Sequence, residues 1–291
     1  MKGLFKTGVC SRLALAIGML AVLPIATQAQ AQSAVKCPVE PLPVTKAGYL
    51  TMSINPTIPP KQYIDKQGNL IGLHVDLGNE IARRLCLKPE YARVQFEVQI
   101  PGLQNKRWDM INTGLYYTEA RSKLMQLTPY SVNALALIAA AGNPLGIKGP
   151  EDLAGHVVGV EIAGFEEKKL REMDAAQVKQ GLKPMNIRVF NTYGETFLAL
   201  GAGQVEAVFA GDAIGTYYQQ QGKFTKAATG LLPGTPGAFA TVDIKLAEAI
   251  TAALQSMYED GTYAKMMDAY GTTKIDAWKL WEGKIRYYYN P

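Results

Sequence analysis

Histidine and cysteine are scarce in this sequence of 291 residues, which holds two histidines and three cysteines. The histidines, His74 and His156, each precede a hydrophobic segment, which favours structural or exposed roles over catalysis. The chain has no metal-ligand spacing, no nucleophile elbow, no P-loop and no Gly-x-Gly-x-x-Gly motif. We therefore expect no metal and no cofactor. Carboxylates and tyrosines remain available for catalysis, but none stands at a catalytic spacing, and we expect a protein that is not an enzyme.

Long hydrophobic runs are lacking outside residues 1–31. Within that stretch, three basic residues and no acidic residue precede an apolar run at 13–26, and Ala29-Gln30-Ala31 forms a small-x-small cleavage pattern. The pattern predicts a secretory signal peptide over 1–31 and a periplasmic, soluble mature protein. A membrane anchor is the alternative, although the run is short for a membrane span.

A strong excess of either charge is also lacking. The chain has 30 basic and 25 acidic residues, and removal of the leader's three basic residues leaves 27 against 25. This near balance gives no reason to expect nucleic acid or an anionic membrane surface as a partner.

Two cysteines, Cys37 and Cys86, remain after the leader is removed. Exported proteins live in an oxidising compartment, where such a pair commonly forms a disulfide. Cys86 lies near the end of a helix expected over 76–87. The predicted bridge would attach the N-terminal segment to this helix.

Strand-like and helix-like segments alternate along the chain. Alternation of this kind predicts a parallel sheet with helices on its faces, and it occurs twice, which indicates two α/β units in series. We expect strands over 48–54, 91–96, 109–115, 133–140, 156–160, 187–190 and 205–210. Helices are expected over 76–87, from Pro101 to about 108, from Thr118, from Gly164 or Phe165, from Thr192 to 201–203, over 243–261 and over 262–270. Residues 230–237 read as a Gly/Pro-rich connector, and Trp278, Trp281 and 287–289 as an aromatic tail that packs on the body.

The stretch from Trp108 to Arg121 carries the clearest signal of a binding site. Thr118 is a good N-cap, so Arg121 falls in the first turn of a helix, where the macrodipole disfavours a cation. An arginine there needs a partner, and its planar fork suits a carboxylate. Either Arg121 binds a ligand carboxylate beside the backbone of Gly114–Tyr116, or it forms a local ion pair with Glu119 or Asp109.

Further candidates follow the expected strands, because ligands of open parallel sheets bind at the carboxyl ends of the strands. Free N–H groups at the helix start near Gly164 could take the other side of a carboxylate. Asp212 could bind an ammonium group, or it is a solvated carboxylate or helix cap. Glu161 either lies at a rim or faces a ligand, and Phe96 either stacks on a ligand or packs in the core. Asn55, which follows the first strand, is the last candidate.

Motifs in order along residues 46–275 resemble the polar and opine amino-acid binders among the bacterial extracellular solute-binding proteins, family 3, which serve ABC transporters. The segment 68–82 resembles the turn and first helix of that family, and 151–160 the start of its second lobe. Its central motif is matched by Ile100-Pro101-Gly102-Leu103, Thr118-Glu119-Ala120-Arg121 and Thr128-Pro129-Tyr130-Ser131. Two later motifs of the family are also matched. Residues 203–207 with Asp212 resemble the first of them, and residues 246–263 resemble the second.

The resemblance implies the fold of a type II periplasmic binding protein, in which two Rossmann-like lobes are joined by two crossing strands and close on a ligand. The first lobe would comprise 32–132 with 241–291, and the second lobe 133–240. By this resemblance Arg121 binds the α-carboxylate, Gly114 and Tyr116 contact the ligand, and Phe96 stacks on it. Gly164 and Phe165 match the start of the family's second-lobe helix. Asp212 matches the family's amine-binding aspartate, although its spacing from the preceding Val-Glu-Ala strand is one residue longer than in the family.

The chain departs from the family pattern in three places. Ile54 stands where binders of basic amino acids carry an acid, 57–60 replaces an aromatic residue, and Tyr116 replaces a serine or threonine. Glu161 could replace the lost acid. The implied function is capture of an amino acid or related carboxylate for an ABC permease, by a monomer. An exported dehydratase acting on prephenate or arogenate, and a ligand-sensing partner of a membrane sensor, are the alternatives.

Overall fold

The computed structural model describes Cys37 and residues 40–275. The predicted signal peptide and the predicted aromatic tail lie outside these residues. None of the described helices is both long and apolar enough to cross a membrane. The described strands form one eight-stranded sheet in the order β5-β1-β6-β11-β7-β10-β8-β9, and a small sheet β2-β3-β4.

One end of the large sheet forms the first lobe. Its strands β1 (Tyr49–Ile54), β5 (Lys88–Arg93) and β6 (Met110–Ile111) pair in parallel. Helix α1 (Leu73–Arg84) buries Leu73, Leu77 and Ile81, spaced four residues apart on one face. Those side chains share a core with α7 (Ile244–Glu259) and α8 (Thr262–Ala269), so the C-terminal helices complete the first lobe.

The other end forms the second lobe from β10 (Ala207–Gly211), β8 (Val157–Glu161) and β9 (Asn186–Phe190), again in parallel. Three helices accompany these strands, namely α4 (Phe165–Lys179), α5 (Tyr193–Gly201) and α6 (Asp212–Gln220). Two separate apolar cores form between sheet and helices. Helix α6 was not predicted, because its sequence is mixed and Asp212 read as a loop residue.

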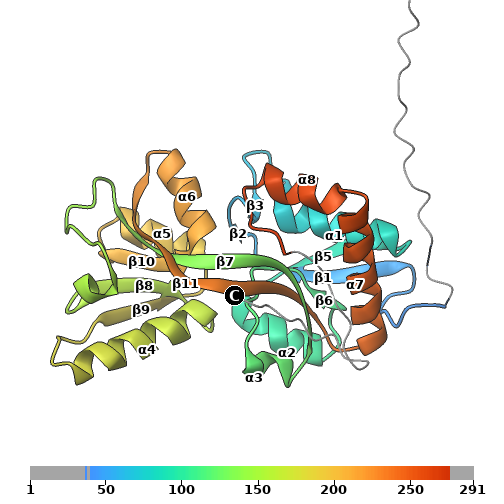
Figure 1. Ribbon diagram of the computed structural model, residues 1–291, viewed down its shortest axis with the longest axis horizontal. Coiled ribbons are helices and arrows are strands. Elements are labelled where there is room, and N and C mark those ends of the chain that lie inside the picture. Colours follow the sequence, from blue (N-terminus) through green and yellow to red (C-terminus); the bar gives the residue numbers. More distant parts are fainter. Residues whose placement is uncertain (1–36, 38–39, 276–291) are drawn as a thin grey trace, which may run out of the picture. The chain divides into compact units, whose positions relative to one another are not determined.

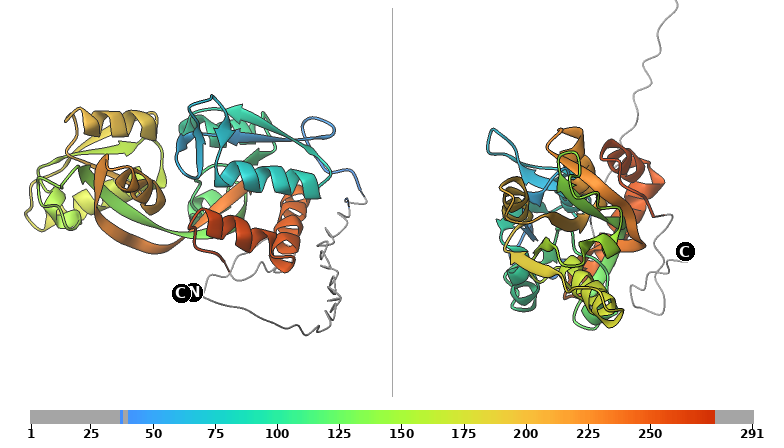
Figure 2. Two further views of the ribbon diagram at one scale, coloured as in Figure 1. Left: turned by 90° about the horizontal axis from the view of Figure 1, so that it is seen from above. Right: turned by 90° about the vertical axis from the view of Figure 1, so that its left-hand side faces the viewer.

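Two long antiparallel strands, β7 (Gln126–Ala140) and β11 (Phe224–Thr241), connect the lobes. Figure 1 shows them side by side, running from one group of strands to the other, and Figure 2 shows the same pair from two further directions. The prediction that 230–237 is a connector is wrong, since these residues belong to β11. Register shifts, including those between Ala228 and Leu231 and between Leu231 and Thr235, accommodate the glycines and prolines within the strand.

The crossing point lies where Ser131 pairs with Gly237 and Asn133 with Thr235. Ala238, Phe239 and Ala240, which the predicted division assigns to the second lobe, pack in cores of the first lobe. We propose on this packing that the β11 crossing lies nearer residue 237 than residue 240.

The remaining described elements are short. They are β2 (Thr57–Ile58), β3 (Gln62–Ile64), β4 (Leu70–Ile71), the 3-10 helices η1 (Phe96–Val98) and η2 (Pro150–Leu153), and the helices α2 (Gln99–Gln104) and α3 (Glu119–Ser122). The predicted strand 91–96 was placed three residues too late, since β5 spans 88–93, and the predicted strand 109–115 was too long. Phe96 begins a 3-10 turn, and only two residues near 110 pair with β1 before the chain turns toward the cavity.

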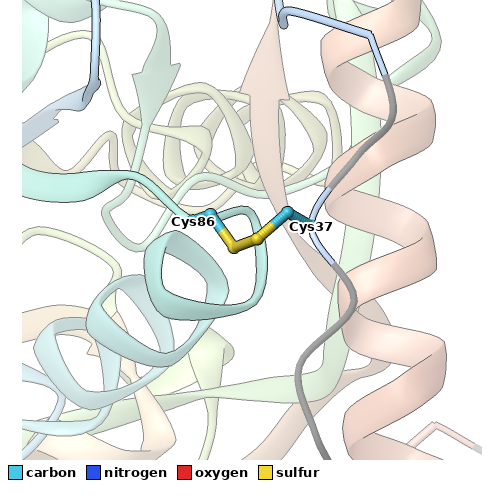
Figure 3. The surroundings of a disulfide bond; sticks show 2 residues. All are labelled: Cys37 and Cys86. Atoms are coloured by element: carbon cyan, nitrogen blue, oxygen red, sulfur yellow. A yellow bond between two sulfur atoms is a disulfide. The ribbon is translucent and has the colours of Figure 1, made fainter.

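The disulfide between Cys37 and Cys86 is present, as predicted. Figure 3 shows it joining the N-terminal segment to the chain that follows helix α1. The helix ends at Arg84, and Cys86 has a positive φ of 55°. This left-handed residue turns the chain out of the helix and places its sulfur at the helix end.

Candidate functional site

A cavity of about 610 Å³ opens where the two lobes meet the crossing strands. Its size is within the roughly 300–1,000 Å³ of small-molecule sites. The first lobe contributes Ile58, Pro60, Lys61, Gly114, Tyr116 and the segment 269–273, and the second lobe Glu166, Tyr193 and residues around Asp212 on α6. The crossing strands contribute Val132, Asn133 and Gly237. The lining is aromatic as well as charged, because it includes five tyrosines: Tyr116, Tyr130, Tyr193, Tyr217 and Tyr270.

Arg121 lies on α3, next to the cavity and behind Tyr116. Thr118 caps the helix by accepting the Arg121 backbone N–H at 3.1 Å, as predicted. The Arg121 Nη1 atom donates to the Tyr116 carbonyl at 2.9 Å, and its Cζ atom lies 5.6 Å from the Phe96 ring centroid. Burial lowers the pKa of the guanidinium, and the charge of Glu166 opposes this shift.

The local ion pairs considered for Arg121 are absent from the described residues. Glu119 pairs with Lys123 at 3.0 Å, and Asp109 accepts hydrogen bonds from the backbone and side chain of Thr51. The guanidinium therefore forms no salt bridge within the described part of the chain. A half-buried cation without a carboxylate is suited to an anionic ligand.

Tyr116 reaches from the first lobe into a core of the second lobe. Its ring centroid lies 5.1 Å from that of Phe165 at the start of α4. A Cβ atom on Gly211 would lie 3.1 Å from the Tyr116 hydroxyl, so the absence of a side chain at Gly211 makes room for the ring. Burial raises the pKa of this hydroxyl well above its usual range, which keeps it neutral.

Asn55 and Glu161 join the lobes directly. Asn55 follows β1, and Glu161 is the last residue of β8. The Asn55 Nδ2 atom donates to Glu161 Oε1 at 2.8 Å. Both are buried, with exposed fractions of 1% and 3%. Burial, and then the charge of Glu166, raise the pKa of the Glu161 carboxyl well above its usual value, which favours the neutral acid. Neither Asn55 nor Glu161 lines the cavity.

Glu166 is the first cavity residue that the sequence reasoning missed. It was read only as an acid that complements the dipole of α4. The structure buries it at the cavity, which Tyr193 also lines. Burial raises the pKa of Glu166, while Arg121 and Lys61 favour its ionised form. A carboxylate thus stands at the helix start where free N–H groups near Gly164 were predicted to receive an anion.

Asp212 lines the cavity but is already paired. Its Oδ2 atom lies 3.1 Å from Lys226 Nζ, and its Oδ1 atom accepts a hydrogen bond from Thr229. Both partners come from β11, more than a dozen residues further along the chain. Because Lys226 neutralises it, Asp212 is a weaker candidate than Glu166 for binding an ammonium group.

Lys61 is the second missed residue. It lies between β2 and β3 with an exposed fraction of 8%, and its Nζ atom donates to Asn133 Oδ1 at 2.5 Å. Its carbonyl accepts the His74 N–H at the start of α1. Gly72 allows this close approach, because a Cβ there would lie 2.5 Å from the carbonyl oxygen. Burial lowers the pKa of Lys61 to about 8, with Glu166 and then Asp212 opposing the shift.

The predicted site residues therefore fall into three groups. Gly114, Tyr116 and Asp212 line the cavity. Arg121 and Phe96 lie together behind Tyr116. Asn55, Glu161, Gly164 and Phe165 lie at the carboxyl ends of the strands around it without lining it. An unexplained lysine in a proline-rich loop was the one sequence signal that could have indicated Lys61.

The lowered pKa of Lys61 makes the unfolding free energy depend on pH. An unfolded lysine has a pKa near 10.5, so between about pH 8 and 10.5 the unfolded chain binds more protons and stability rises with pH. From pH 8 to 9.5 we expect the wild type to gain about 2 kcal/mol relative to Lys61→Met.

This dependence is measured by urea unfolding of both oxidised proteins at pH 7, 8 and 9.5. The charges facing Lys61 are Glu166, Asp212 and His74, and burial keeps His74 neutral by lowering its pKa well below 6.5. Tyr116 and Tyr130 also stay neutral here, since burial raises the pKa of both hydroxyls. Parallel pH profiles of the two proteins would contradict a buried, titrating Lys61.

Residues 50–273 match the family model of the bacterial extracellular solute-binding proteins, family 3. The chain belongs to this family. The resemblance drawn from its motifs is thereby confirmed, and so is the α/β fold of two lobes joined by crossing strands.

Curated relatives of this solute-binding protein match over different lengths. PatH of Vibrio harveyi is 35% identical over 137 residues, which cover 47% of this chain and 52% of PatH. The L-cystine-binding protein TcyJ of Escherichia coli K12 is 24% identical over 57% of this chain and 59% of TcyJ. The match therefore spans less than two thirds of either protein. The ABC transporter arginine-binding protein 1 of Escherichia coli K12 is 24% identical over 75% of this chain and 89% of the relative.

Solved structures share the fold over most of the described residues. An ancestral arginine-binding protein bound to arginine is 29% identical, with a TM-score of 0.70, over 77% of this chain and 98% of the other. An ancestral amino acid-binding protein that is a precursor of cyclohexadienyl dehydratase has a TM-score of 0.68 at 24% identity, over 77% of this chain and 95% of the other. The second likeness shows the fold alone.

Proposed function

We propose that this solute-binding protein captures an amino acid in the cavity between its lobes and delivers it, as a periplasmic monomer, to an ABC permease. The observation that carries the proposal is a pair of opposite charges contributed by the two lobes. Arg121 of the first lobe and Glu166 of the second lobe influence each other's pKa but form no salt bridge within 4 Å among the described residues. A zwitterion matches both groups.

The carboxylate of such a ligand would bind Arg121 through two parallel N–H···O bonds. Its ammonium group would face Glu166 and the Tyr193 hydroxyl. For Arg121 to reach the ligand, the Tyr116 ring has to move from its place against Phe165. Hinge motion at the crossing strands would provide this opening, and the ligand's contacts with both lobes would stabilise the closed form.

Relatives support the class of ligand. The names of TcyJ and of arginine-binding protein 1 specify cystine and arginine, and ancestral arginine-binding protein has been solved with arginine and with glutamine. The shared part of these ligands is the α-amino and α-carboxylate pair. We therefore propose that Arg121 and Glu166 bind this shared part.

A thermal-shift screen of the purified mature protein tests the proposal. We expect at least one amino acid or opine to raise the melting temperature, because a ligand at 100 times its Kd adds about 2.7 kcal/mol to the free energy of unfolding. The same compound without its α-carboxylate, as the decarboxylated amine, should have no effect. If no amino acid stabilises the protein, or if it converts prephenate or arogenate, amino-acid capture is not its function.

A further inference from the structure

Lys61 is a charged group of the cavity that the proposed zwitterion site does not use. It lines the cavity together with Glu166 and Asp212. Within the described part of the chain Lys61 forms no salt bridge, and its side chain donates to a neutral amide, that of Asn133. A buried ammonium group is costly unless a charge compensates for it. The arrangement is therefore incomplete without an anion.

The ammonium group is held in a defined place. Asn133 on β7 is oriented by its own amide, whose Nδ2 atom donates to Ser131 Oγ at 3.0 Å, so its oxygen points to Lys61. A Cβ on Gly237 would lie 2.7 Å from Asn133 Nδ2 and 2.7 Å from Ser131 Oγ, so the absence of a side chain at Gly237 makes room for this hydrogen bond. Lys61 is thus anchored to the crossing strands, and not solvated like an ordinary loop lysine.

The charges around the cavity do not balance. Lys226 neutralises Asp212 at 3.1 Å. Burial and the charge of Glu166 favour the neutral form of Glu161, and they outweigh the opposing hydrogen bond from Asn55. Two cations, Lys61 and Arg121, then stand against one carboxylate, Glu166. A simple zwitterion would leave this excess positive charge uncompensated, whereas a ligand with a net charge of about −1 would complement it.

We propose that Lys61 binds a second carboxylate, so that the ligand is an amino acid with an additional carboxylate, either an acidic amino acid or an N-carboxyalkyl amino acid. The proposal rests on the amino-acid site described above and adds its specificity. Arg121 receives the α-carboxylate, Glu166 the ammonium group, and Lys61, which Asn133 positions, the additional carboxylate. Lys61 is therefore the residue that discriminates an acid from its amide.

Isothermal titration with matched pairs of ligands tests this assignment. The pairs are L-glutamate with L-glutamine, L-aspartate with L-asparagine, and N-(1-carboxyethyl)-L-alanine with L-alanine. In each pair the first member carries one more carboxylate and has a net charge of about −1. We expect the first member of at least one pair to bind about 30-fold or more tightly than the second, by the cost of leaving a buried charge unpaired.

Variants assign the preference to a residue. Lys61→Met is expected to remove the preference while keeping affinity for the amide or for L-alanine, and that retained binding shows that the variant is folded. Lys66→Met is the control, because Lys66 is exposed in the turn after β3 and does not line the cavity. Lys61→Arg should retain the preference.

Three outcomes overturn the proposal. If the second member of every binding pair is preferred, or if Lys61→Met leaves the ratio of affinities unchanged, Lys61 does not bind a carboxylate and the amino-acid site stands without it. If no amino acid of either kind binds, the proposed function fails together with this inference.

Discussion

Replacing Arg121 by methionine is expected to weaken ligand binding by about 2–5 kcal/mol, the usual cost of leaving a buried charge unpaired. This corresponds to about a 30-fold or larger increase in Kd. The guanidinium is oriented by the Tyr116 carbonyl and the Phe96 ring, and lacks a carboxylate partner among the described residues. Titration of whichever amino acid emerges from the thermal-shift screen measures the effect.

The matched control is Lys123→Met, at the residue that follows α3. Lys123 is exposed and pairs with Glu119 on the surface, so its loss should change Kd little. Unfolding curves separate binding from structure. If Arg121→Met lowers the free energy of unfolding but leaves Kd unchanged, Arg121 only orders the segment around Tyr116 and does not bind ligand.

Removal of the disulfide is expected to lower the free energy of unfolding by about 4 kcal/mol. The bridged residues, Cys37 and Cys86, are 49 positions apart, and in the loop-entropy model the cost follows from the size of that loop in the unfolded chain. Neither cysteine lines the cavity. Ligand affinity should therefore persist at temperatures where the variant remains folded.

Two double variants separate the bridge from the backbone at Cys86. Its φ of 55° suits glycine better than alanine. Cys37→Ala with Cys86→Gly isolates the loss of the bridge, and Cys37→Ala with Cys86→Ala should cost roughly 1 kcal/mol more. Denaturant unfolding of both, beside the oxidised wild type, gives the values. A loss below about 1 kcal/mol in the glycine variant would falsify a stabilising role for the bridge.

Local signals predicted much of the fold. Thr118, Thr192 and Asp243 accept backbone N–H groups at the starts of α3, α5 and α7, as their residue types indicated. These contacts span two or three residues, so the sequence contains both partners. The errors occurred where pairing partners are distant. Residues 230–237 look like a connector, but they become strand because β7 pairs with them across about a hundred residues.

The candidate site divides in the same way. Arg121 stood out because a cation in the first turn of a helix is locally unfavourable, and its need for a partner could be inferred without tertiary information. Only the structure excluded the local ion pairs with Glu119 and Asp109. Glu166 and Lys61 gave no such signal, since an acid at a helix start and a lysine in a loop are ordinary. Burial at the cavity makes both unusual. Asp212 shows the converse, because Lys226 from β11 neutralises the charge that made it a candidate.

The sequence by itself therefore determined the family, the alternation of most strands and helices, the cysteine pair and the candidacy of Arg121 as a ligand-binding residue, since each depends on composition, on motif order or on neighbours within a few residues. Only the tertiary structure decided which charges are buried, which are paired, and which are left for a ligand. Desolvation and Coulomb interactions act through space, and the residues that bury Lys61 or neutralise Asp212 are identified only when the crossing strands bring the two lobes together.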